Sequence, residues 1–257
     1  MTCGHRRAYI TDPLVINVAI LPASSPVPVP HPVPEANTAG RRSTKGTATP
    51  ANRRRRKEAR PQELLQAALE LFVEHGFAAS RIEEVAQRAG VSKGTLYLYY
   101  ASKEELFKAV VRHNLSTLIA EGEEAARQFE GSSSALLSFL LHAWWDRVGN
   151  TPAAGIHKIV LAEVRNFPEL AQFYTDEVII PADRLFCGCV QRGIDRGEFR
   201  PMPLHEVAHA LIAPLIFMAV HRHSFGCCPV QGVDIDPAAM LDTHLDLVLR
   251  GLEVRQP

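Results

Sequence analysis

The chain has 257 residues, 46% of them hydrophobic, which is enough for one large or two modest domains. Its 28 basic and 28 acidic residues balance, yet residues 41–112 hold fifteen basic against eight acidic (net +7) and residues 113–257 hold eleven against eighteen (net −7). A basic block favours a phosphate-binding module, because clustered Lys and Arg release counterions from nucleic acid, although a solvated charged face has the same composition. Five cysteines without framework spacing exclude a typical disulfide-stapled secreted domain.

The first 52 residues are rich in proline. Prolines occupy nearly every second position from 22 to 34, and each lacks the backbone N–H that regular structure needs. We expect residues 1–52 to be a disordered extension, or an upstream stretch translated from a misassigned start, and the sequence does not distinguish the two. The nearest apolar run, residues 14–21, falls short of the roughly 18 residues that a membrane helix needs. The sequence therefore predicts a cytoplasmic protein with no membrane partner.

Beyond residue 52 the chain is predicted to be all-α, with about nine helices, because apolar residues recur at intervals of three and four without strand-like alternation. A long helical region opens at residues 53–57. We expect its first helix at 61–75, with Pro61 in the first turn and Gly76 at the end. A second helix is predicted at 81–89, with Ser80 and Glu83 forming a capping box.

A short helix at 93–100 follows a tight turn at Gly90, and Ser92 is its predicted cap. The next helix is predicted to start after Ser102 and to run to about residue 121. Two short helices joined by a glycine turn are typical of a helix-turn-helix, whose second helix enters the major groove of DNA. Leu96 and Tyr100 are expected to face inward. The candidate DNA-binding residues offer hydroxyl and amine groups to phosphates and bases, and one glycine lets the backbone approach the duplex closely. They are Ser92, Lys93, Gly94, Thr95, Tyr97 and Tyr99.

The stretch from Gly76 to Phe107 resembles the TetR/AcrR family of regulators. The closest likeness lies in the run Ala89-Gly90-Val91-Ser92-Lys93-Gly94-Thr95-Leu96-Tyr97, followed by Tyr99-Tyr100 and Ser102-Lys103-Glu104-Glu105-Leu106-Phe107. Tyr100 stands where the family often has Phe. The resemblance implies that Ser80 and Lys103 contact phosphates. It also implies a DNA-binding domain at 53–113 and a helical ligand-sensing and dimerisation domain at 114–257.

The resemblance further implies a homodimer on operator DNA, whose interface is built from helices at about 204–220 and 236–250. Such a protein is expected to be a repressor that a small-molecule inducer releases from its operator. The alternative for the two interface helices is that they are ordinary core helices of a monomer. The ligand pocket is expected where aromatic and lone polar side chains share apolar faces. The sequence does not identify the compound, and the candidates are Phe139, His142, Trp145, His157, Phe173 and Phe186, with Trp144 beside them.

A zinc-dependent hydrolase is the alternative function. His205, Glu206 and His209 match the H-E-x-x-H motif, in which two imidazoles one turn apart bind zinc. No third ligand can be identified by spacing, and short motifs often match by chance. Four further residues between 221 and 228 carry metal-capable atoms, but adjacent cysteines suit a metal site poorly. We therefore expect no metal, no cofactor and no enzymatic activity, and we interpret Cys187 and Cys189 as small buried side chains.

Overall fold

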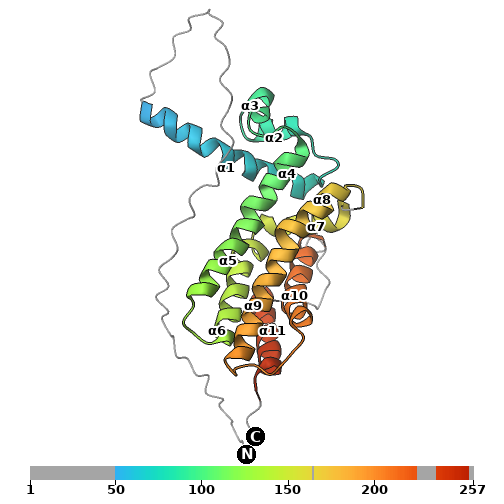
Figure 1. Cartoon of the computed structure of the whole chain (residues 1–257). Coiled ribbons are helices and arrows are strands. Elements are labelled where there is room, and N and C mark those ends of the chain that lie inside the picture. Colours follow the sequence, from blue (N-terminus) through green and yellow to red (C-terminus); the bar gives the residue numbers. More distant parts are fainter. Residues whose placement is uncertain (1–49, 164, 225–235, 255–257) are drawn as a thin grey trace, which may run out of the picture. The chain divides into compact units, whose positions relative to one another are not determined.

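The computed structural model describes residues 50–163, 165–224 and 236–254, with side chains from residue 61 onward. In these ranges the protein is all-α, apart from one isolated β-bridge between Phe199 and Glu253. Figure 1 shows the helices, which are α1 (Pro50–His75), α2 (Ile82–Arg88), α3 (Lys93–Tyr97), α4 (Lys103–Val111), α5 (Thr117–Gln128), α6 (Ser133–Trp144), α7 (Gly155–Glu163), α8 (Pro168–Tyr174), α9 (Ile180–Asp195), α10 (Leu204–Ser224) and α11 (Pro237–Leu252).

Single π-helical segments join some of these helices end to end. Residues 112–116 connect α4 to α5, and residues 175–179 connect α8 to α9. Eleven α-helical segments therefore make nine continuous helices in the described ranges, as the sequence predicts. The predicted Pro-rich extension at 1–52 lies outside these ranges except for its last three residues, which begin α1.

The first helix is longer than the sequence predicts. α1 begins at Pro50, eleven residues before the expected start, and Pro61 lies inside it rather than in its first turn. Residues 51–60 are mostly Ala, Arg, Lys and Glu, which are strong helix formers, so the helix extends across the proline. It ends where predicted, because Gly76 adopts a left-handed φ of +81°.

The start of α2 also differs from the prediction. Its N-cap is Arg81, which makes no side-chain capping bond. The Ser80 hydroxyl instead donates to the Gly76 carbonyl at 2.6 Å, and only 3% of the residue is exposed. The expected capping box is therefore wrong, because the hydroxyl satisfies a carbonyl at the end of α1 rather than an amide of α2. The caps of α3 and α4 agree with the prediction: Ser92 and Ser102 accept from the backbone amides three residues ahead.

The first hydrophobic cluster gathers α1 to α4 with α7 and α8. Its centre is a group of three aromatic rings, Phe72, Phe77 and Phe107, whose centroids lie 5.2–5.7 Å apart. All three are at most 2% exposed. The cluster continues past residue 113 to Ile156 and Phe173. The helix-turn-helix therefore shares a core with helices of the proposed sensing domain.

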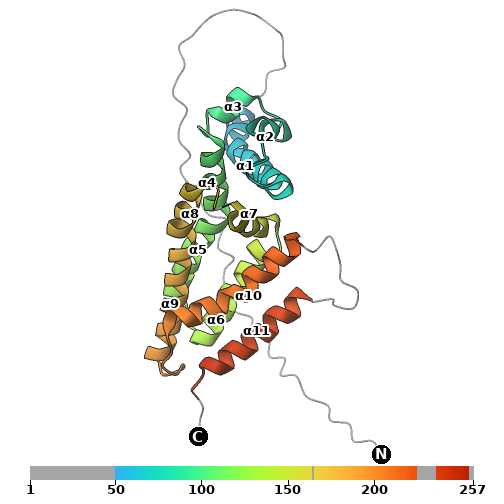
Figure 2. The same ribbon diagram turned by 90° about the vertical axis from the view of Figure 1, so that its right-hand side faces the viewer.

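The second hydrophobic cluster gathers α6, α9, α10 and α11. α10 packs against both α9 and α11, and Figure 2 shows it lying between them. Leu211 and Leu215 from α10 contribute fully buried side chains, as do Leu241 from α11 and Val190 from α9. The last two helices begin and end within four residues of their predicted bounds.

Among the helices of the described ranges, α10 is long and apolar enough to cross a membrane by length and composition. The search for uninterrupted apolar runs in the sequence did not find this segment, because Pro214 and several histidines interrupt it. The expectation that no segment is long and apolar enough is therefore corrected. Val207, Leu211 and Leu215 lie in the second cluster, so α10 is part of the protein core.

Candidate nucleic-acid interface

The short helix α3 presents polar side chains outward and is held by two buried anchors. Leu96 is 0% exposed and Tyr100, just beyond the helix, is 7% exposed, as predicted. The Ser92 hydroxyl accepts from the Thr95 amide at 3.1 Å, so the cap is formed before any DNA is bound. The other predicted contact positions lie on this helix or directly beside its ends and are exposed or half-buried. Ser92, Lys93, Gly94 and Tyr97 are exposed, whereas Thr95 and Tyr99 are half-buried.

Lys93 is paired with an acidic residue of α2. Its Nζ lies 2.5 Å from Glu83 Oε1 and 5.7 Å from the centroid of the Tyr97 ring. The hydrogen bond and charge of Glu83 raise the pKa of Lys93, which is therefore fully protonated at neutral pH. An exposed pair of this kind contributes little stability, so Lys93 can exchange Glu83 for a base edge or a phosphate.

Leu98 is a surface feature that sequence reasoning missed. It lies directly after α3, and it is 55% exposed between Tyr97, at 43%, and the half-buried Tyr99. An exposed leucine beside a groove-entering helix is suited to contact with a thymine methyl group. The sequence carried no signal for this residue, because a leucine in a helical segment can lie on a surface as well as in a core.

Ser80 and Lys103 hold the loop between α1 and α2. The Lys103 ammonium donates to the carbonyls of Phe77, Ala78 and Ser80 at 2.8–3.1 Å, and it lies 4.5 Å from the Phe77 ring centroid. The Ser80 hydroxyl is turned inward, toward the end of α1. Both side chains therefore have intramolecular partners, and a phosphate contact by Lys103 would compete with three hydrogen bonds.

The four aromatic residues among the six predicted sensor residues are divided between the two clusters. Phe173 belongs to the first, with the Arg112 guanidinium 4.8 Å from its ring centroid. The remaining aromatic candidates, Phe139, Trp145 and Phe186, belong to or pack against the second. His142 bridges α6 and α11, since its Nε2 lies 3.2 Å from Asp242 Oδ1. These residues do not form one continuous lining.

His157 on α7 is the candidate whose surroundings suit a polar anchor. It is 5% exposed, and its Nδ1 lies 2.7 Å from the hydroxyl of Tyr174 on α8. Burial lowers its pKa to about 4, so the imidazole is neutral at physiological pH. Its Nε2 is buried and has no hydrogen-bond partner among the described residues. The ring of Trp144 lies 5.7 Å away, so the unpaired nitrogen has an aromatic neighbour.

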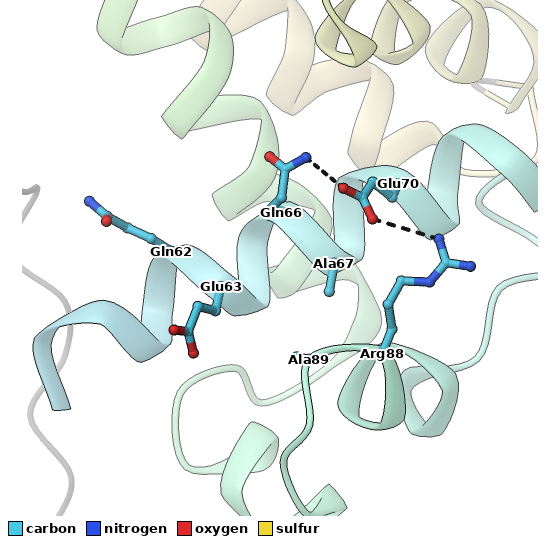
Figure 3. Close-up of a pocket in the computed structure, with 7 residues that line it drawn as sticks. All are labelled: Gln62, Glu63, Gln66, Ala67, Glu70, Arg88 and Ala89. Atoms are coloured by element: carbon cyan, nitrogen blue, oxygen red, sulfur yellow. Dashed lines mark hydrogen bonds and ion pairs between the residues drawn. The ribbon is translucent and has the colours of Figure 1, made fainter. Parts of the chain in front are cut away.

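The described ranges also contain an open pocket of about 440 Å³ between α1 and α2. Figure 3 shows that it is bordered by polar and charged side chains, with Arg88 pointing toward Glu70. Arg88 also pairs with both carboxylate oxygens of Glu74, at 2.8 and 2.6 Å. Five of its seven residues are polar or charged and none is aromatic, so it does not match the aromatic pocket expected of the sensor. The residues around it are Gln62, Glu63, Gln66, Ala67, Glu70, Arg88 and Ala89.

Comparison with known proteins places this site in a family. The model of the family described as bacterial regulatory proteins, tetR family, matches residues 64–110. The uncharacterized HTH-type transcriptional regulator YfiR of Bacillus subtilis (strain 168) is 30% identical over 155 residues, which cover 59% of this chain and 74% of that protein. The chain belongs to the tetR family. It is thus a helix-turn-helix DNA-binding transcriptional regulator, and the hydrolase alternative is set aside because the family consists of regulators rather than enzymes.

Two further comparisons extend over most of the chain. The repressor KstR2 of Rhodococcus jostii (strain RHA1) is 27% identical over 207 residues, covering 80% of this tetR-family chain and 97% of that protein. The crystal structure of the regulator FadR from Bacillus subtilis in complex with stearoyl-CoA covers 75% of this chain and 99% of that one. Its TM-score is 0.59 at 19% sequence identity, so the likeness shows the shared fold.

Proposed function

We propose that this regulator is a cytoplasmic homodimeric repressor that leaves its operator when a small molecule binds behind the DNA-binding domain. The DNA-binding domain spans residues 53–113, and residues 114–257 sense the ligand and dimerise. The observation that carries the proposal is the geometry of α3, which exposes Lys93 and Tyr97 while Leu96 is buried beneath them. Two such helices about 34 Å apart would enter successive major grooves of a near-palindromic site.

Selection from a random duplex library tests DNA recognition and identifies the operator sequence in the same experiment. The purified full chain should enrich a near-palindromic sequence whose half-sites are about one helical turn apart. Enrichment of no sequence, or equal retention of all duplexes at low salt, would show a protein without operator specificity and would contradict the proposal.

The proposed sensor centres on His157 and Tyr174. A neutral buried imidazole with an unpaired Nε2 among aromatic side chains suits a mostly apolar ligand that carries one hydrogen-bonding group. The acyl chain and thioester carbonyl of stearoyl-CoA, which is bound by the structurally similar FadR, have this character, so stearoyl-CoA is the probe to try first. Of the other predicted lining residues, Phe173 lies in the first cluster with Tyr174 and belongs to this sensor. Phe139, Trp145 and Phe186 lie at the second cluster, and His142 pairs with Asp242, so these four are not part of the sensor proposed around His157.

Tryptophan fluorescence provides a direct readout, because Trp144 and Trp145 are the only two tryptophans in the chain. Addition of stearoyl-CoA should change their emission and should release the selected DNA. Since the two binding events are linked, DNA must weaken ligand binding by the same factor. The variant His157→Gln should bind the probe more weakly and retain DNA binding. Probe binding that leaves both the emission and DNA affinity unchanged would contradict this placement of the sensor.

A further inference from the structure

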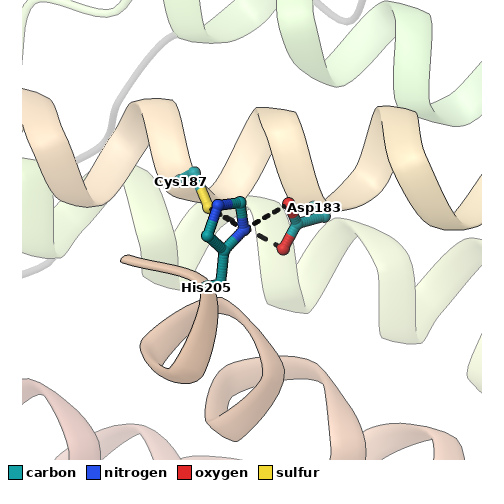
Figure 4. A group of neighbouring side chains, drawn as sticks. All are labelled: Asp183, Cys187 and His205. Atoms are coloured by element: carbon teal, nitrogen blue, oxygen red, sulfur yellow. Dashed lines mark hydrogen bonds and ion pairs between the residues drawn. The ribbon is translucent and has the colours of Figure 1, made fainter. Parts of the chain in front are cut away.

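Four metal-ligating side chains lie together where α9 meets α10. Asp183 and Cys187 are one turn apart on α9, and His205 and His209 are one turn apart on α10. The Cys187 Sγ lies 3.6 Å from His205 Nδ1 and 3.7 Å from Asp183 Oδ1. His205 Nδ1 lies 2.8 Å from Asp183 Oδ2. Figure 4 shows the side chains of Asp183, Cys187 and His205 converging on one point from the two helices.

The spacing of these atoms suits a tetrahedral ion. Ligand atoms at about 2.0–2.3 Å from zinc in a tetrahedron are separated from one another by about 3.3–3.8 Å. The two distances from the Cys187 sulfur lie in this range, and the shorter His205–Asp183 contact needs only a small rotation of the carboxylate. The His209 Nδ1 lies 3.8 Å from Asp183 Oδ1 and 2.7 Å from the His205 carbonyl oxygen, so the His209 ring must turn to offer its Nε2 as the fourth ligand.

The chemistry of the four donors also favours zinc. One thiol, two imidazoles and one carboxylate are the ligand types of Zn²⁺ sites, whereas Ca²⁺ and Mg²⁺ prefer oxygen donors alone. The imidazoles are open to solvent, with side-chain exposures of 76% for His205 and 71% for His209, so an ion can reach them. Cysteine binds zinc as the thiolate, so an incoming ion would displace the Cys187 thiol proton to solvent.

We propose that Asp183, Cys187, His205 and His209 form a Zn²⁺ site that joins α9 to α10. The site uses both histidines of the H-E-x-x-H motif, but its third and fourth ligands come from α9. Four protein ligands leave no open position for a water nucleophile, so the site is structural or sensory rather than hydrolytic. By holding together two helices that are consecutive in the chain, the ion stabilises the folded state over the unfolded one.

Titration of the full chain with Co²⁺ tests the site, because cobalt replaces zinc in such sites and gives a thiolate charge-transfer absorption. We expect one equivalent of Co²⁺ to produce this band and Zn²⁺ to abolish it by competition. Cys187→Ser should remove the band, and His205→Asn should weaken Co²⁺ binding at least tenfold. The His205 side chain is largely exposed, so this second variant keeps the fold, which circular dichroism checks.

Two controls separate this site from other thiols. Cys189→Ser changes a buried cysteine of the same helix and should keep the band. The double variant Cys227→Ser with Cys228→Ser should keep it as well. Zn²⁺ should also raise the thermal unfolding midpoint of the natural chain but not that of His205→Asn. Absence of the band, or its persistence in Cys187→Ser, would overturn the proposal. None of these measurements involves DNA, so their outcome is independent of the proposed repressor function.

Discussion

Gly193 lies in α9 where the ring of Phe199 packs against the helix backbone. A Cβ at this position would lie 2.1 Å from Phe199 Cδ2, and Phe199 is 2% exposed, so the ring has no free space to move into. We expect Gly193→Ala to lower the free energy of unfolding by about 1–3 kcal/mol through overpacking, measured by urea denaturation. Gly188→Ala is the matched control in the same helix, because nothing lies within 4 Å of its added Cβ. Equal stabilities of the two variants would refute the packing argument.

Lys93 is the side chain on α3 best suited to recognise a base. Lys93→Ala should weaken specific operator binding by about 1–3 kcal/mol and should affect random DNA less. Arg184→Ala removes the same charge from an exposed position on α9 and serves as the control. Fluorescence anisotropy titrations on the selected duplex measure the affinity of both variants. Equal losses of affinity would show that Lys93 contributes only its charge and does not recognise a base.

Lys103 gives rise to two expectations. The family resemblance implies a phosphate contact, so Lys103→Ala should weaken binding to all DNA and flatten the salt slope by about one. The three hydrogen bonds to the loop at 77–80 predict in addition a loss of about 1–3 kcal/mol in the free energy of unfolding. Salt-series titrations together with urea denaturation distinguish the two contributions. An unchanged stability would show that the loop does not depend on this side chain.

The packing of α7 against α8 is sensitive to acid through His157. Its pKa is about 4 in the folded protein and 6.5 as the ordinary value, so between these values the unfolded chain binds the proton more strongly. The free energy of unfolding therefore falls as the pH drops through this window, by about 2 kcal/mol at pH 5 for this group. Urea unfolding at pH 7.5 and pH 5 measures the loss. The variant His157→Gln should lose less, and an equal loss would assign the acid sensitivity to other groups.

An ion pair joins the π-helical segment that follows α4 to the π-helical segment that precedes α9. Arg112 donates to both carboxylate oxygens of Glu177, at 2.7 and 2.5 Å, and it also covers the Phe173 ring. Two parallel hydrogen bonds fix the orientation of the guanidinium relative to the carboxylate as well as their separation. Together with the shared first cluster, this pair links the segment after α8 to the segment after α4, and we propose that ligand binding acts on the helix-turn-helix through these contacts.

The proposed dimer requires an apolar surface on the last two helices. Phe217 on α10 is 64% exposed and Leu247 on α11 is 68% exposed, which is unusual for side chains of this size. Phe217→Glu should convert a dimer to a monomer in analytical ultracentrifugation. It should weaken operator binding by about 100-fold or more, because two linked half-site contacts become one. Leu161→Glu changes an equally exposed residue on α7 and should leave the dimer intact. A monomeric natural chain would refute this part of the proposal.

Sequence patterns anticipated those features that depend on neighbours within about four residues. The turn at Gly90, the caps at Ser92 and Ser102, and the inward positions of Leu96 and Tyr100 all follow from hydrogen bonds and helical periodicity inside one short segment. The all-α class follows from the same periodicity, whereas the bounds expected for α10 and α11 came from the family resemblance. For this reason the amino-acid sequence alone was sufficient to recognise the helix-turn-helix and, with it, the family.

Contacts between distant segments were beyond the reach of those patterns. The binding of Lys103 to the loop at 77–80 depends on how α4 lies against the end of α1. Ser80 is a local exception, because its hydroxyl donates back to the Gly76 carbonyl instead of capping α2. The meeting of Asp183 and Cys187 with His205 depends on how α10 lies along α9. Burial, pairing and the convergence of ligands depend on atoms brought together by packing, and one-dimensional spacing carries no information about which helix faces will meet.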